Sequence, residues 1–324
     1  MTIRSRLFTR ADLAALLEFI STVAAARAQS VYLMTSDVAW RLPGSAPKDN
    51  VRLWFDDAGL AGYVWFEPAT AMEFDVRDDL GFGHPCVREM LEWSESRRRE
   101  YPPAYPRFID LESMEAWTNE IMQPRAPQSD DGLCLTTMAF EHDASRVAFL
   151  EANGFRATRH FMPDYRRNLE NPIPSSTLPD GMRLRHVTDA DLDERVAVHR
   201  ASWLRSTWSA DTYRKIRSNP VYDAELDIVL ETPDGTFASY CICWLDRKTG
   251  VGSYEPVGTR ADWRGRGVGR EIIYEGFRRL RAKGMRAARV GTAGFNGPAQ
   301  ALYESCGFER IGTCRTFLKV VDGS

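Results

Sequence analysis

The sequence predicts an α/β protein that consists of two similar units. Runs over 226–231 and 237–245 flank a Pro233-Asp234-Gly235 turn and indicate a β-hairpin, and a strand-like run over 251–259 precedes an amphipathic helix. The first half repeats this order, with a helix over 13–25 before a hairpin within 51–66. A chain of 324 residues is long enough for two domains of about 150 residues each.

The remaining elements follow from the same patterns. In the second half we expect strands over 182–187 and 287–290, helices over 210–217 and 296–303, and closing strands within 306–320; in the first half, a strand over 133–138 and a helix over 143–153.

A glycine-rich loop, Arg264-Gly265-Arg266-Gly267-Val268-Gly269, lies between the strand over 251–259 and an amphipathic helix over 270–283. The first amides of a helix lack partners and its N-terminus is electropositive, while glycines let the main chain approach a ligand closely. Arg264, Arg266 and Arg270 add positive charge. This arrangement predicts a pyrophosphate site.

Two familiar phosphate loops do not fit this segment. The dinucleotide fingerprint G-x-G-x-x-G places its third glycine at Arg270 when read from Gly265, and at Ile272 when read from Gly267. The P-loop pattern G-x-x-x-x-G-K-[ST] is absent from the sequence. What does fit is R-x-x-G-x-G after a strand.

A second block stands after the helix and reads Asn296-Gly297-Pro298-Ala299-Gln300-Ala301-Leu302-Tyr303-Glu304-Ser305-Cys306-Gly307-Phe308. Together the loop and this block resemble the GCN5-related N-acetyltransferases (GNATs), with the R-x-x-G-x-G loop and an N-x-x-A-x-x-L-Y-x-x-x-G-F ending. The resemblance implies acetyl-CoA as cofactor and a mixed, largely antiparallel sheet flanked by helices. It also implies a parallel strand pair that splays apart at the acetyl-CoA site.

The resemblance also implies roles for individual residues. Glu255 is the expected general base, although several family members carry that glutamate two positions earlier, where this chain has Ser253; a structural role for Glu255 remains open. Tyr303 is the expected acid for the leaving thiolate, with core packing as its alternative. Asn296 is expected to cap its helix and to touch the cofactor. The expected cofactor-binding residues are Val257, Gly258, Thr259, Arg264, Gly265, Arg266, Gly267, Val268, Gly269, Arg270 and Asn296.

The two halves are related by a period near 153 residues, which aligns Gly154-Phe155 with Gly307-Phe308. A proline-rich segment separates them. We therefore predict a degenerate N-terminal GNAT-like domain over 1–170, a linker over 171–180 and a catalytic C-terminal GNAT domain over 181–324.

The first half departs from the pattern where a cofactor would bind. Its loop over 77–85 contains Asp78 and Asp79, which would repel a pyrophosphate, and Leu150 stands where the second half has Tyr303. We expect only the C-terminal domain to bind coenzyme A, and the first half to wall the acceptor pocket.

Composition narrows the class further. An apolar content of 44% with 27% charged residues is ordinary for a globular protein, and no apolar run approaches the roughly 20 residues of a bilayer span. The six cysteines lack paired metal spacing, and we expect no metal site and a cytoplasmic protein. Residues 1–170 carry 19 basic and 26 acidic side chains, and residues 171–324 carry 23 and 19. The basic surplus suits coenzyme A rather than nucleic acid, because no concentrated basic stripe accompanies it.

We conclude that the sequence predicts a tandem acetyltransferase that transfers acetyl to the amine of a small molecule, as a monomer or homodimer. Asp75, Asp78 and Asp79 suggest a cationic acceptor by charge alone. The alternative is a catalytically silent acyl-CoA-binding protein, against which the retained Tyr303 argues. Mycothiol synthesis is a related architecture that no residue singles out.

Overall fold

The computed structural model describes residues 3–27, 30–42, 48–66, 71–101, 133–203, 206 and 208–321. The first half contains β1 (Arg4–Leu7), α1 (Leu13–Ala26), α2 (Thr35–Arg41), β2 (Val51–Asp56), β3 (Gly59–Phe66), β4 (Met72–Val76), α3 (Pro85–Glu100), β5 (Leu133–Phe140), α5 (Ala144–Ala152) and β6 (Arg156–Asn168).

The second half contains β7 (Arg183–His186), α6 (Leu192–Ser202), α7 (Ala210–Arg217), β8 (Asp227–Glu231), β9 (Phe237–Asp246), β10 (Val251–Thr259), α8 (Val268–Ala282), β11 (Ala287–Gly291), α9 (Gly297–Ser305) and β12 (Glu309–Val321). The elements expected from the sequence are present, and those over 210–217 and 251–259 agree residue for residue. Helices α2 and α3 were not predicted, and the closing segment is one long strand rather than several.

The described strands form a four-stranded sheet in the order β1-β2-β3-β4 and an eight-stranded sheet in the order β5-β12-β6-β11-β10-β9-β8-β7. Within the larger sheet β10 and β11 run parallel, while the neighbours on either side of this pair are antiparallel. The predicted mixed, largely antiparallel architecture with a parallel pair is therefore confirmed.

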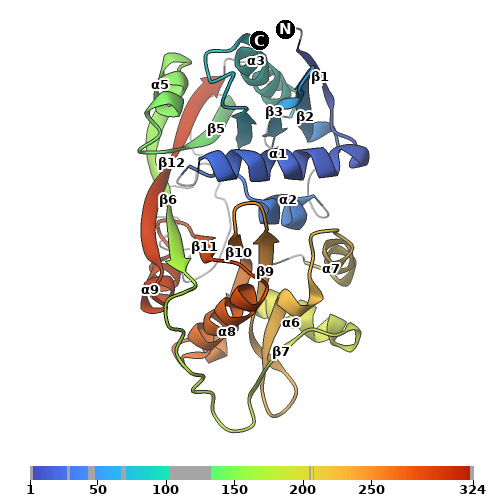
Figure 1. Cartoon of the computed structure of the whole chain (residues 1–324), viewed down its shortest axis with the longest axis vertical. Helices are drawn as coiled ribbons and strands as arrows, with labels where there is room; N and C mark the ends of the chain where they lie inside the picture. The colour runs from blue at the N-terminus through green and yellow to red at the C-terminus, as the bar shows by residue number, and fades with distance from the viewer. Residues whose placement is uncertain are drawn as a thin grey trace.

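The last strand of each half pairs with strands of the other half. Strand β6 of the first half pairs with β11 of the second, and β12 of the second half pairs with both β5 and β6. In Figure 1 the red strand β12 climbs beside β5 and α5, and the green strand β6 descends toward α9. The predicted division at 171–180 stays a prediction, because the sheet itself continues across it.

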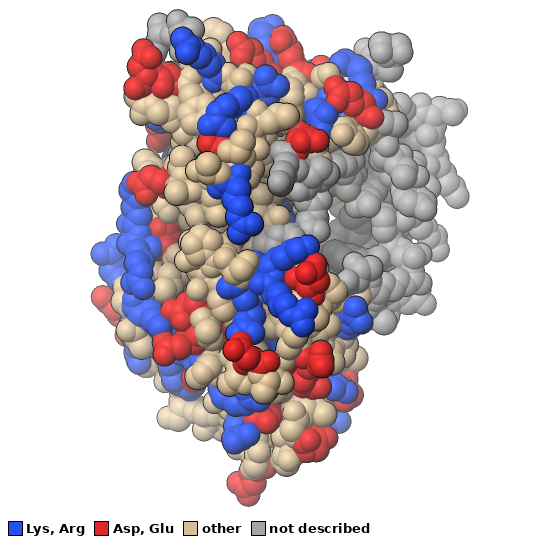
Figure 2. All heavy atoms as spheres, turned by 90° about the vertical axis from the view of Figure 1, so that its right-hand side faces the viewer, with Lys and Arg blue, Asp and Glu red and all other residues tan. Residues whose placement is uncertain are grey.

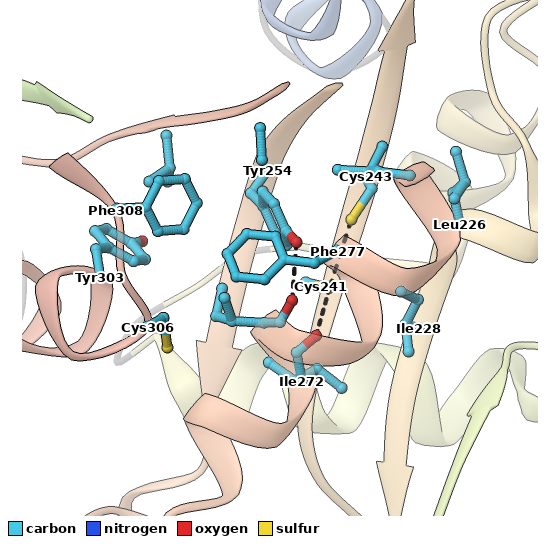
Figure 3. Packing of buried hydrophobic residues seen from close by; sticks show 14 of the residues in the cluster. Leu226, Ile228, Cys241, Cys243, Tyr254, Ile272, Phe277, Tyr303, Cys306 and Phe308 are labelled. Carbon is cyan, nitrogen blue, oxygen red and sulfur yellow. Dashed lines mark hydrogen bonds between the residues drawn. The ribbon is translucent and has the colours of Figure 1, made fainter. Parts of the chain in front are cut away.

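The core of the second half lies between its sheet and α8. Tyr254, Phe277 and Phe308 pack with ring centroids 5.2–6.1 Å apart, and Tyr303 lies 5.8 Å from Phe308 (Figure 3). Cys241 and Cys243 of β9 face this core together with their sulfur atoms 3.9 Å apart, as their alternation predicts.

On the face shown in Figure 2, acidic and basic side chains are interspersed over most of the coloured surface. None of the helices within the described ranges is long and apolar enough to cross a bilayer.

The exchanged strand β12 supplies a test of this architecture. Phe317 is 3% exposed and packs in the core of the first half, whereas Val320 on the same strand is 50% exposed. We expect Phe317→Ala to lower the free energy of unfolding by about 3–5 kcal/mol and Val320→Ala by less than about 0.5 kcal/mol. Urea unfolding followed by tryptophan fluorescence and circular dichroism should show one shifted transition. Two transitions, of which only one shifts, would contradict a shared sheet.

Candidate active site

The site begins where the parallel strands β10 and β11 of the larger sheet separate. Strands β10 and β11 pair from Val251 to Ser253 and no farther, although β10 continues to Thr259. The pairing of β10 with β9 also shifts register between Tyr254 and Val257, which is a bulge. The Trp244 indole donates a hydrogen bond of 2.6 Å to the Glu255 carbonyl within this bulge. The expected splay is therefore present, and Glu255 lies just past it.

The loop after β10 is open toward solvent. Gly265 and Gly267 have φ angles of +75° and +82°, a region that favours glycine, and Gly267 caps α8 without a side-chain hydrogen bond. A Cβ atom at Gly265 would meet no atom within 4 Å. The amides of Gly265, Arg266 and Gly267 donate no hydrogen bond to any described residue. Free amides and open space at the start of a 15-residue helix fit the pyrophosphate of coenzyme A.

This loop, the end of β10 and α9 enclose a groove of about 490 Å³. Its walls are Ser202, Trp203, Val257, Gly258, Thr259, Trp263, Arg264, Gly265, Gly267, Gly269, Arg270, Phe295, Asn296, Pro298, Ala299, Ala301, Leu302, Tyr303 and Ser305. Most of the cofactor-binding residues expected from the sequence thus surround one space.

Three of the expected residues play different parts in the geometry. The Arg266 guanidinium packs 5.0 Å from the Trp263 ring and does not line the groove, and Val268 is buried in the core. Arg264 lines the groove, but its guanidinium donates to the carbonyl oxygens of Thr259 and Ser202 at 3.2 and 3.0 Å. Arg264 therefore ties the loop to β10 and α6.

Asn296 caps α9 as expected, since its side chain accepts a hydrogen bond of 3.2 Å from the Ala299 amide. The following turns carry Ala299, Leu302 and Tyr303 into the groove. These are the alanine, leucine and tyrosine of the sequence block, so the block describes one wall of the site.

Glu255 is half-buried and lies outside the lining of the groove. Burial raises the pKa of its carboxyl to about 8, and the nearby carboxylate of Asp37 adds to this rise while Arg41 opposes it. A carboxyl with such a pKa exchanges its proton near neutral pH, which is what a general base requires.

Tyr303 is 6% exposed, and its ring packs against Phe308 and against Tyr165, whose centroid is 6.1 Å away. Burial raises its pKa above the ordinary value, and the charge of Glu255 contributes to this rise. The hydroxyl therefore holds its proton at neutral pH. Tyr303 therefore packs in the core and also lines the groove. Its role as the acid stays a prediction.

Tyr240 and His199, to which the sequence did not point, support Trp203 on the other side of the sheet. The Tyr240 hydroxyl lies 2.6 Å from Nδ1 of His199 and accepts a hydrogen bond of 2.8 Å from the Trp203 indole. Burial lowers the pKa of His199 to about 3, so the imidazole is neutral and Tyr240 donates to it. A Cβ on Gly258 would clash with the Tyr240 ring. This network fixes Trp203, which lines the groove.

Helix α2 of the first half was also missed. It packs on β9 and β10 and lies directly above their ends in Figure 1. Trp40 stacks on Trp208 of the second half with centroids 5.6 Å apart, and Asp37 and Arg41 act on Glu255. Helix α2 has only seven residues and lies in the half without a cofactor motif, so the sequence contains no signal that predicts this contact.

In the first half, β4 and β5 belong to different sheets and are joined, among the described residues, by a single parallel bridge between Ala71 and Thr136. Beyond this bridge the side chain of Arg146 lies between the two strands. Arg146 is 1% exposed, and its guanidinium donates to the carbonyl oxygens of Phe74 in β4 and Met138 in β5 at 3.1 and 2.9 Å. The guanidinium also lies 3.9 Å from the centroid of the Tyr32 ring. Helices α5 and α9 begin at Ala144 and Gly297, so Arg146 holds the helix position that Ala299 holds in the groove.

The comparisons with known proteins agree with this geometry. The sequence model of the acetyltransferase (GNAT) family matches residues 194–308. A mycothiol acetyltransferase of Propionibacterium freudenreichii subsp. shermanii is 25% identical over 222 residues, which make up 64% of this chain and 71% of that protein.

Two solved structures share the fold over nearly the whole length. A GCN5-related N-acetyltransferase of Sphaerobacter thermophilus has a TM-score of 0.62 at 17% identity, covering 98% of this chain and 96% of the other. A tandem GNAT protein from the clavulanic acid biosynthesis pathway has a TM-score of 0.60 at 14% identity and covers 100% of both chains.

Residues 194–308 thus match the GNAT acetyltransferase family, and the two halves together share the fold of a tandem GNAT protein. Acetyl-CoA is the acyl donor of this enzyme.

The two ends of α8 provide a matched test of the cofactor loop. Gly267 and Gly284 have φ angles of +82° and +87°, but only Gly267 lines the groove. We expect Gly267→Asp to weaken acetyl-CoA binding by at least about 10-fold, because a carboxylate would repel the pyrophosphate. Calorimetric titration measures the affinity, and Gly284→Asp is the control for backbone strain. Equal losses in the two variants would place the cofactor elsewhere.

The raised pKa of Glu255 predicts a pH-dependent stability. The native carboxyl keeps a proton that the unfolded chain releases near its ordinary pKa of about 4.3, so this contribution is lost as pH rises through about 8. Glu255→Gln should therefore gain thermal stability relative to the parent protein between pH 6 and pH 9. Glu92→Gln, at an exposed position on α3, is the control and should show no such gain. A constant difference for Glu255→Gln would show that its carboxyl is charged throughout this range.

Proposed function

We propose that this protein transfers acetyl from acetyl-CoA to the amine of a small molecule, and that only the second half binds the cofactor. The observation that carries the proposal is the common location of the splay, the open loop and two protonation groups, Glu255 and Tyr303. The loop and the groove would hold the cofactor, with Gly265, Gly267 and the start of α8 at its pyrophosphate and Val257–Thr259 along its pantetheine arm.

Bound acetyl-CoA supplies the acetyl group as an activated thioester and is left as a thiol. The amine acceptor must lose protons to react, because a lysine-like amine has a pKa of about 10.4 and only about one molecule in 2,500 is neutral at pH 7. Glu255 lies beside the splay with a carboxyl that takes up a proton near pH 8. It therefore serves as the base, directly or through water, as the new carbon–nitrogen bond forms.

Tyr303 supplies the opposite transfer. Its hydroxyl is protonated at neutral pH and it lines the groove. As the carbon–sulfur bond breaks, Tyr303 donates its proton to the sulfur and regains one from solvent. The net reaction converts an ammonium group and a thioester into an amide, a thiol and one released proton.

A small acceptor is supported by the position of the first half. Helix α2 packs on β9 and β10, brings Asp37 and Arg41 close to Glu255, and stacks Trp40 on Trp208. An acceptor would thus enter a space between two halves rather than an open groove. The name of the relative, mycothiol acetyltransferase, also places a small molecule in its reaction.

One cofactor per chain is supported by Arg146. Its guanidinium takes the place between β4 and β5 that the pantetheine arm would need, and it satisfies a carbonyl group on each strand. Asp78, at the mouth of the corresponding cleft, is paired with Arg27. A cofactor could enter only by displacing a buried cation from its hydrogen bonds.

The proposal predicts separate effects on chemistry and on binding. Glu255→Gln and Tyr303→Phe should each lower kcat by about 10²–10⁴-fold with the affinity for acetyl-CoA kept, because each removes a proton transfer. Thiol release with a panel of amines measures turnover, and calorimetry measures affinity.

Tyr274→Phe on α8 is the matched control, since Tyr274 packs against the core but does not line the groove. Unchanged turnover in Tyr303→Phe would contradict its role as the acid. If the protein binds acetyl-CoA but releases no thiol with any amine of the panel, a catalytically silent acyl-CoA-binding protein would be favoured.

A further inference from the structure

A second pocket lies between the two halves, next to the part of β10 and β11 that is still paired. It has a volume of about 220 Å³. Residues of both halves line it, among them Arg166 of β6, Asp246 and Lys248 at the end of β9 and the turn after it, Ser253 of β10, and Arg286 and Arg289 in and just before β11. Four of these side chains are basic and one is acidic.

Three of the lining residues form a row across adjacent strands. Ser253 of β10 is in register with Arg289 of β11, and Arg289 is in register with Arg166 of β6. Two arginines directly opposite each other in an antiparallel pair repel, and such pairs destabilise a sheet unless an anion lies between or beside them. The sheet thus holds two guanidinium groups side by side at the wall of a pocket.

The carboxylates nearby compensate only part of this charge. Asp164 is buried and accepts hydrogen bonds from Nε and Nη2 of Arg289, which satisfies that arginine. The side chain of Arg166 is half-buried and makes no hydrogen bond or ion pair with a described residue, although it faces Glu309 in the β6–β12 register. At the mouth, Lys248 is paired with Glu18 and Asp246 accepts from the amides of Lys248 and Thr249. Arg286 is exposed and donates to the Thr249 carbonyl oxygen at 3.4 Å. Arg166 is therefore the half-buried cation of the wall that no described residue pairs.

The pocket is close to the reacting groups. Ser253 lines it, and Glu255 follows two residues later on β10, a separation of about 7 Å in an extended strand. Asp37, whose charge acts on Glu255, comes from the same helix α2 as Thr35 in the pocket wall. Arg166 lies two strands across the sheet from Ser253, roughly 10 Å at a strand spacing of about 4.8 Å. An acceptor with its amine at Glu255 must therefore reach across β11 to place a group beside Arg166.

We propose that this pocket binds an oxyanion of the acceptor, a carboxylate or a phosphate, so that the acceptor is an amine that also carries an anionic group. The inference rests on the proposed function and adds the class of acceptor. It also revises the cationic acceptor suggested by Asp75, Asp78 and Asp79, because these carboxylates are paired with Arg27 and Arg77 and lie outside both this pocket and the groove.

The test uses acceptors in matched pairs that differ only in the anionic group. The pairs are glycylglycine and its C-terminal amide, 6-aminohexanoate and its amide, and phosphoethanolamine and ethanolamine. Thiol release from acetyl-CoA gives kcat/KM for each. We expect the anionic member of at least one pair to exceed its neutral partner by about 10-fold or more, as a hydrogen-bonded charge pair would give. The pair that responds distinguishes carboxylate from phosphate.

Arg166→Gln should reduce the ratio of kcat/KM between the anionic and the neutral partner about 10-fold. The fold should tolerate the change because the Arg166 side chain pairs with no described residue, whereas Arg289 is held by Asp164 and is not substituted. Arg159→Gln, at an exposed position of the same strand, is the control and should keep the preference.

Equal use of anionic and neutral partners, or no use of any anionic amine by a protein that binds acetyl-CoA, would overturn the inference and leave the proposed function standing. A preference that survives in Arg166→Gln would also overturn it. Failure to bind acetyl-CoA would overturn the proposed function and the inference together.

Discussion

The site depends on one constraint, the separation of β10 from β11 after Ser253. While the two strands are paired, their main-chain groups satisfy each other and no ligand can enter between them. Beyond Ser253 the bulge turns Glu255 out of the regular pattern, Trp244 holds its carbonyl, and the free edge of β10 leads to the loop at the start of α8. The groove, the base and the pocket beside Arg166 all follow from where this pairing ends.

Each half has a space between two neighbouring strands, which is open in the second half and filled in the first. In the second half, Ala299 leaves the space beside the splayed strands open, and in the first half Arg146 fills it and donates to both strands. A buried guanidinium is stable there because two carbonyl oxygens and three aromatic rings surround it. The first half therefore has a structural role: it shares strands with the second half, and its helix α2 packs on β9 and β10 near Glu255.

Most of the secondary structure and the cofactor loop could be predicted from the sequence, because both depend on local patterns: period-two strands, glycines at a helix start, and the block from Asn296 to Phe308. The exchange of β6 and β12 could not, since strands of equal length and similar apolar pattern fit either half. Neither could the contacts of α2, the Tyr240–His199 pair or the row of Ser253, Arg289 and Arg166, because these arise only from register and packing between distant segments. The roles given to Glu255 and Tyr303 stay predictions.

The most direct test of the account is the number of acetyl-CoA molecules that one chain binds, measured by calorimetric titration of the purified protein. We expect one site per chain, with its affinity lowered at least about 10-fold in Gly267→Asp. A second site, or a site whose affinity Gly267→Asp leaves unchanged, would contradict the account, because it would mean that the cofactor also binds elsewhere, as in the cleft occupied by Arg146.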